Sequence, residues 1–202
     1  ISFEDDGPSV TTMTATASGA VVTDETDDLG DAIVGAASVF TGGDVDLGED
    51  GGSSAVTLLI NTEATGFKTT DGDKAITLVA DTTDASIVYG KYDDTGTQDG
   101  TAFTISIAST GVLTVTQAVA MVHPTSPNDY DEAITLGDKL LAVVTATDGD
   151  NDVATKSVAI GAQISFEDDG PETIASETGF MLNKLMQPSL TGLALDIDTN
   201  ID

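Results

Sequence analysis

One stretch of the sequence decides the fold class: Ala102-Phe103-Thr104-Ile105-Ser106-Ile107. Its apolar residues Phe103, Ile105 and Ile107 alternate with hydroxyl-bearing residues, which is the period-two pattern of a β-strand with one buried face. A helix would need apolar residues three and four positions apart. The stretch therefore predicts a strand whose three apolar side chains point into a core.

Similar short stretches, rich in Val, Thr and Ala, recur along the chain and are separated by turns that contain Gly and Asp. Several such strands with few helical stripes predict an antiparallel β-sandwich. Residues 28–40 are ambiguous, and the end of 112–122 is also compatible with a helical turn. The expected strands are 10–23 (as one or two strands), 55–60, 75–80, 86–90, 102–107, 112–122, 139–147 and 153–160.

An octapeptide occurs twice without change. Ile1-Ser2-Phe3-Glu4-Asp5-Asp6-Gly7-Pro8 returns as Ile164-Ser165-Phe166-Glu167-Asp168-Asp169-Gly170-Pro171. Such a repeat indicates a tandem array in which the octapeptide separates one module from the next. We therefore expect a β-sandwich module over residues 1–163, a boundary motif and linker over 164–178, and a short helix or the start of a following module over 179–202.

The chain is strongly acidic: 35 Asp and Glu residues face six lysines and no arginine, and the formal net charge is −29. Two carboxylates about 4 Å apart repel by about 1 kcal/mol in water and about 4 kcal/mol near a protein surface. Because six lysines cannot offset this repulsion, we expect cations to bind where acids gather in turns. The charge excludes nucleic acid as a partner and argues against docking onto anionic membranes.

The chain has no cysteine and no apolar run of 18 residues. Neither disulfides nor thiolate metal sites can therefore stabilise it, and we expect no insertion into a membrane. Calcium is the stabilising agent that remains available to an acidic extracellular module.

The strongest local metal signal is Asp148-Gly149-Asp150-Asn151-Asp152. Acids at alternate positions around a glycine can direct their oxygens to one point, as calcium requires. An EF-hand is excluded because Val153 stands at the position of its glycine and Ala159 at that of its glutamate. A solvated acidic hairpin is the alternative.

Other acids are candidate calcium ligands with plainer alternatives. The octapeptide acids could instead flank a simple Gly-Pro turn, Asp71-Gly72-Asp73 could be an ordinary hairpin turn, and the acids of 24–28 could cap a helix. The residues of these three groups that we single out as ligands are Glu4, Asp5, Asp6, Asp24, Asp27, Asp71, Asp73, Glu167, Asp168 and Asp169.

His123 is the only histidine. A lone histidine beside Pro124 is more often a packed or surface residue than a catalytic base. With no nucleophile motif accompanying it, the sequence predicts no catalytic residues and no enzyme.

An ordered set of short motifs over residues 1–171 resembles a repeat module of the large repeats-in-toxin (RTX) adhesins, which Gram-negative bacteria export by type I secretion. Besides the two octapeptides, the motifs are Thr23-Asp24-Glu25, Val39-Phe40, Gly66-Phe67, Thr69-Thr70, Gly72, Ala102 to Ile105, Gly111 to Gln117, Val122-His123-Pro124 and Thr147-Asp148-Gly149-Asp150.

The resemblance implies a secreted, calcium-loaded β-sandwich on the bacterial cell surface. It implies calcium ligation by Asp148, Asp150, Asp152 and the boundary acids, with several ions bound. It also implies attachment, as in biofilms, through a peptide or glycan ligand on a target cell or matrix. The second copy departs from the first after Pro171, which favours such a ligand-binding module. The alternative is an extender that contacts neighbouring modules of the same chain and spaces a distal adhesive domain; either would be a monomeric module.

Overall fold

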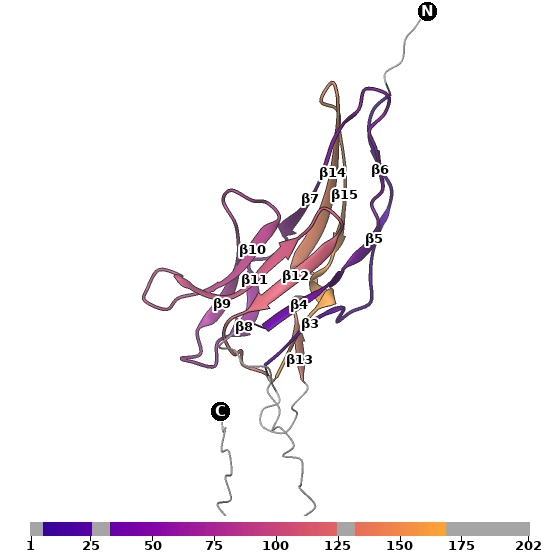
Figure 1. Cartoon of the computed structure of the whole chain (residues 1–202). Coiled ribbons are helices and arrows are strands. Elements are labelled where there is room, and N and C mark those ends of the chain that lie inside the picture. Colours follow the sequence, from indigo (N-terminus) through magenta and orange to yellow (C-terminus); the bar gives the residue numbers. More distant parts are fainter. Residues whose placement is uncertain (1–5, 26–32, 125–131, 169–202) are drawn as a thin grey trace, which may run out of the picture. The chain divides into compact units, whose positions relative to one another are not determined.

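The computed structural model describes residues 6–25, 33–124 and 132–168 (Figure 1). The chain divides into two compact units, Ile1–Gly170 and Pro171–Asp202. The second unit lies outside the described residues, and so does the helix or following module expected at 179–202. The described residues of the first unit are all-β apart from one short 3₁₀ helix, η2 (Gly161–Gln163). Among them, no helix is long and apolar enough to span a membrane.

The larger sheet contains the stretch from which the fold was predicted. Phe103 and Ile105 are fully buried and Ile107 nearly so, which confirms the alternation. All neighbours in this sheet are antiparallel. The strand order is β4 (Ile33–Ser38), β12 (Val112–Gln117), β11 (Gly100–Ile107), β10 (Ile87–Tyr92), β9 (Ala75–Ala80) and β8 (Ala64–Lys68).

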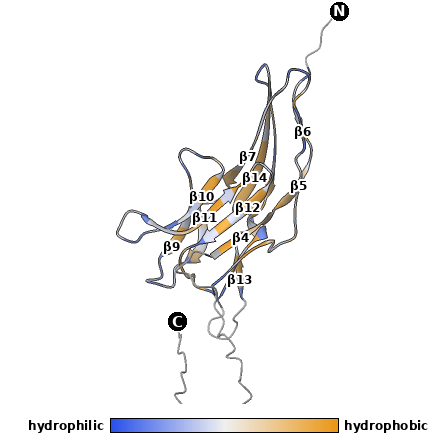
Figure 2. Ribbon diagram, in the orientation of Figure 1, coloured by the Kyte–Doolittle hydropathy of each residue, from blue (hydrophilic) through white to orange (hydrophobic). Residues whose placement is uncertain are grey.

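A second antiparallel sheet has the order β15 (Val153–Ala159), β14 (Leu140–Asp148) and β7 (Gly52–Ile60). In β14 every second residue from Leu140 to Asp148 is buried, so one face of this strand lies against the core. Buried residues of both sheets form one hydrophobic core. Figure 2 shows hydrophobic residues on the central strands and hydrophilic ones on the connecting loops. The antiparallel β-sandwich is therefore confirmed.

A third sheet contains the second copy of the octapeptide. Its order is β13 (Ala133–Thr135), β16 (Ile164–Glu167) and β3 (Val21–Asp24), and β16 runs parallel to β3. Phe166 is fully buried, with its ring centroid 4.9 Å from that of Phe103 and 5.8 Å from that of Phe67. The first compact unit therefore continues beyond residue 163, because the boundary motif supplies a core strand.

The N-terminal part forms more and shorter strands than the sequence predicted. Residues 10–23 were expected to hold one or two strands, but three begin between positions 9 and 21. β1 (Ser9–Val10) pairs with β6 (Val45–Asp46), and β2 (Met13–Ala15) pairs with β5 (Phe40–Gly42).

Two expectations near the ends of strands are resolved. The strand expected over 112–122 ends at Gln117, and Met121 then forms an isolated bridge with Thr69. No helical turn forms between them, because the backbone there hydrogen-bonds to other strands, as in the bond from Ala118 N to the Ala102 carbonyl oxygen. The sequence left residues 28–40 ambiguous. The structure describes residues 33–40 of this stretch, and their backbone is extended.

Candidate metal centres

The turn between β14 and β15 forms a compact acidic hairpin tip, made of Asp148, Asp150 and Asp152. One carboxylate oxygen from each lies within 4.8 Å of those of the other two. Asp148 is buried, whereas Asp150 and Asp152 are exposed. Asp152 N donates a hydrogen bond of 2.8 Å to Asp148 Oδ1, and Asn151 adopts a left-handed conformation (φ 79°) that closes the turn. The alternation seen in the sequence thus directs three carboxylates to one place.

Two other acidic segments reach the hairpin tip. A Cβ added to Gly149 would lie 2.7 Å from the Asp50 carbonyl oxygen, so glycine is required for this close approach. The Cβ position of Gly7 is 3.9 Å from an Asp152 carboxylate oxygen. Asp6, the neighbour of Gly7 and the only acid of the first octapeptide that the structure describes, therefore lies near the tip.

The hairpin tip suits a hard cation. Calcium takes six to eight oxygen ligands at about 2.3–2.6 Å and accepts carboxylates, backbone carbonyl groups and water. Three converging carboxylates supply part of this shell, and the two exposed ones leave positions open to water or to a ligand. The geometry fits the calcium site expected here, which stays a prediction.

A second cluster, made of Glu25, His123 and Asp168, lies near the other octapeptide copy. Their ligand atoms also lie within 4.8 Å of one another. Glu25 and His123 are only 7% and 4% exposed, and the distance from Glu25 Oε1 to His123 Nε2 is 3.8 Å. Glu25 Oε1 accepts hydrogen bonds from Gln117 Nε2 (2.6 Å) and from Met121 N (2.8 Å). We call this set the buried cluster.

The charge state of His123 depends on its neighbours. Burial of the imidazole acts to lower its pKa, but the Glu25 and Asp168 carboxylates and the backbone of Glu132 outweigh this effect. The pKa of His123 therefore lies above its ordinary value. The expectation of a packed histidine agrees with its burial, but the sequence did not reveal the two carboxylates beside it.

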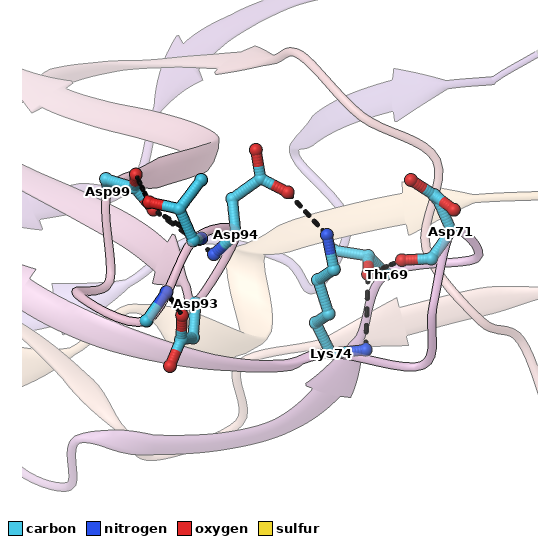
Figure 3. Close-up of polar contacts among 8 residues, drawn as sticks. Thr69, Asp71, Lys74, Asp93, Asp94 and Asp99 are labelled. Carbon is cyan, nitrogen blue, oxygen red and sulfur yellow. Dashed lines mark hydrogen bonds and ion pairs between the residues drawn. The ribbon is translucent and has the colours of Figure 1, made fainter.

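The hairpin turn at Asp71 and Asp73 is arranged differently. Asp73 pairs with Lys68 at 2.7 Å, and the Asp71 carbonyl oxygen accepts a bond from the Thr69 hydroxyl. Lys74 pairs with Asp94, whose hydrogen bond raises the pKa of this lysine (Figure 3). Neither Asp71 nor Asp73 belongs to a three-ligand group among the described residues. Lysines provide local positive charge here.

Some acids serve as turn acceptors, a role that the sequence analysis missed. Asp81 accepts bonds from the backbone and hydroxyl of Thr83, from Asp84 N and from Tyr89, which lower its pKa to about 2. Asp99 likewise accepts bonds from Thr95, as Figure 3 shows. For Asp81 the signal was present as an Asp two residues before a Thr, a spacing typical of Asx turns. Asp99 accepts its bonds from residues that precede it, so this spacing does not reveal its role.

The remaining expected ligands fall into two sets. Asp24 and Glu167 lie opposite each other on β3 and β16 and join neither three-ligand group of the described part of the chain. Glu4, Asp5, Asp27 and Asp169 lie outside the described residues. The sequence thus singled out the hairpin-tip acids and Asp168, which the structure brings into three-residue groups, and metal binding by either group stays a prediction. Glu25 was treated only as part of a diffuse acidic run.

A depression of about 120 Å³ is lined by Thr69, Thr70, Asp71, Tyr92, Val119 and Ala120. Its lining includes no residue of the hairpin tip or of the buried cluster.

The family model described as "Domain of unknown function (DUF5801)" matches residues 20–161. This range covers more than half of the chain, so the chain belongs to the DUF5801 family. The match includes the hairpin tip, Glu25 and His123, and it ends before Asp168 and the second octapeptide copy. No curated protein and no solved structure matches the chain.

Proposed function

We propose that this chain is a calcium-dependent module of a bacterial cell-surface adhesin, acting first as an extender. The observation that carries the proposal is the position of the two octapeptide copies. Asp6 lies near the hairpin tip, and Asp168 lies in the buried cluster beyond β16.

These two places are at opposite ends of the long strand β14. The strand advances eight residues from Leu140 to Asp148, which corresponds to about 26 Å at the usual rise of ~3.3 Å per residue. β13, the antiparallel partner of β16, lies at the far end from the hairpin tip (Figure 1). Modules repeated head to tail would therefore place one octapeptide and one hairpin tip at every joint.

Calcium would couple folding to export. Where calcium is scarce, the acidic loops repel one another and the folded state is disfavoured. Outside the cell, millimolar calcium matches the affinity range of weak extracellular sites, about 10⁻⁴–10⁻³ M. An ion that binds only the folded state adds RT ln(1 + [L]/Kd), or about 1.4 kcal/mol per site at ten times Kd.

Thermal unfolding in millimolar calcium and in chelator tests the proposal. We expect a higher melting temperature in calcium, and a smaller increase in the variant Asp150→Asn/Asp152→Asn. The matched control Asp71→Asn/Asp73→Asn removes the same charge from a turn that has lysine partners. It should keep the full increase. Equal melting temperatures in calcium and chelator for the unsubstituted chain would reject the proposal.

Ligand capture is the second candidate function, and the exposure of the hairpin tip favours it. An ion held by buried Asp148 and by exposed Asp150 and Asp152 would keep coordination positions for a carboxylate or for vicinal hydroxyls of a ligand. Peptide and glycan arrays probed with and without calcium separate the two functions. Calcium-dependent binding that Asp150→Asn/Asp152→Asn abolishes would establish ligand capture. The absence of binding on both arrays would favour the extender.

A further inference from the structure

The buried cluster unites three distant points of the chain. Glu25 follows β3, Asp168 follows β16, and His123 lies shortly after the bridge between Met121 and Thr69. The fold brings these segments together, and the resulting set contains a nitrogen ligand and two carboxylates. The hairpin tip, by contrast, offers oxygen atoms only.

The imidazole of His123 lacks the contacts that burial requires. Neither of its ring nitrogens makes a hydrogen bond of normal length and angle within the part of the chain that the structure describes, although Glu25 and the backbone of Glu132 lie close enough to raise the pKa of the ring. Its Nε2 lies 3.8 Å from Glu25 Oε1, which is too long for a hydrogen bond. A buried polar group without a partner destabilises the folded state, because it has lost its hydration without gaining a hydrogen bond. A group that these residues do not supply is therefore expected to contact the ring.

We propose that Glu25, His123 and Asp168 bind a divalent transition-metal ion of the zinc class. Imidazole nitrogen and carboxylate oxygen are ordinary zinc ligands at about 2.0–2.2 Å, whereas calcium prefers oxygen alone. Zinc would require the three ligand atoms, now within 4.8 Å of one another, to approach to about 3.4 Å in a tetrahedral site. A water molecule would complete the coordination.

The ion has a structural role at this end of the module. Two carboxylates and a neutral imidazole carry a charge of −2, which a divalent ion neutralises. The ion would join the ends of β3 and β16 to the segment that follows β12. The hydrogen bonds from Gln117 and Met121 already orient the Glu25 carboxylate toward the site. This proposal does not depend on calcium at the hairpin tip or on the adhesin function.

Because His123 is the only histidine, its ring can be followed by nitrogen-15 NMR in the unsubstituted chain. The probe is zinc chloride, added to one equivalent while millimolar calcium is present. We expect one ring nitrogen to take the chemical shift of a metal-bound imidazole, and calcium alone to leave the ring unchanged. A ring that does not respond to stoichiometric zinc, or that responds to calcium in the same way, overturns the proposal.

Calorimetric titration with zinc locates the site. Glu25→Gln retains an oxygen that can accept the bonds from Gln117 and Met121 but removes the charged ligand. We expect it to weaken zinc binding by more than about tenfold, since even groups that only orient a metal ligand contribute about 10–100-fold. The control Asp150→Asn/Asp152→Asn should bind zinc with unchanged affinity. If the control loses zinc binding and Glu25→Gln retains it, zinc binds at the hairpin tip and the proposal is wrong. The NMR measurement remains decisive if Glu25→Gln does not fold.

Discussion

The hairpin tip and the buried cluster are both three-residue acidic sites near a copy of the same octapeptide, yet they are built in opposite ways. The tip takes Asp148, Asp150 and Asp152 from one turn, and two of its three side chains are exposed. The buried cluster takes its residues from positions 25, 123 and 168, and two of them are at least nine-tenths buried. A local site tolerates charge because water solvates it, whereas a buried site must neutralise charge internally.

The turn acids show a third way to accommodate negative charge. Asp81 and Asp99 each accept several hydrogen bonds from residues close to them in the chain. Acid density alone therefore does not identify a metal site in this chain. A better criterion is that ligand atoms from three residues lie close together. Among the described residues, this criterion singles out the hairpin tip and the buried cluster.

The largest expected effect concerns the core strand that contains the second octapeptide copy. Phe166→Ala should lower the free energy of unfolding by about 3–5 kcal/mol, since it leaves a cavity beside Phe103 and Phe67. Leu59→Ala is the control, because the Leu59 side chain is 53% exposed. Urea denaturation measures both, and we expect the control to lose far less stability. Equal losses would contradict a core role for Phe166.

A smaller effect separates the buried from the exposed acids. Glu25→Ala removes the acceptor for Gln117 Nε2 and Met121 N, so we expect a loss of about 2–3 kcal/mol. Asp150→Ala, measured in chelator, should change stability by less than about 0.5 kcal/mol, as exposed substitutions usually do. Comparable losses in urea denaturation would mean that burial does not distinguish the two sites.

The change in stability around the pKa of His123 should come from the buried cluster. The pKa of His123 is raised in the folded state above an unfolded value of about 6.5, so protonation favours folding. This stabilisation is complete below the unfolded pKa and disappears as the pH rises through the folded pKa. In chelator, the melting temperature should therefore fall over that window. His123→Gln should flatten the profile, and an unchanged profile would contradict the assignment.

The smallest expected effect concerns the turn acids. The pKa of Asp81, about 2 in the folded state, is held low first by the backbone bond from Thr83 and then by the Thr83 hydroxyl. The resulting stabilisation is present above the usual Asp value of 3.8 and is lost as the pH falls toward 2. Thr83→Ala should raise the pKa of Asp81 in an NMR titration. Adding calcium should leave that pKa unchanged, and a calcium-dependent shift would place Asp81 among the metal ligands.

Local sequence signals predicted much of the fold. The alternation at 102–107 reports burial on one face, and the strand expected at 75–80 has the observed bounds. The pairing of β16 with β3 was beyond such signals, because period-two alternation tells which face is buried but not which strand lies beside it. The octapeptide was accordingly assigned to a boundary, although Ile164 and Phe166 of its second copy are fully buried.

The sequence by itself determined the β-sandwich class and the acidic hairpin tip, since each depends on residues that are neighbours along the chain. Only the tertiary structure decided that Glu25, His123 and Asp168 meet and that the histidine is buried. The hydrogen bond between Met121 N and Glu25 Oε1 closes a loop of 96 residues. Local sequence patterns cannot reveal a contact of that kind, because its two partners are far apart in the chain and share no common pattern.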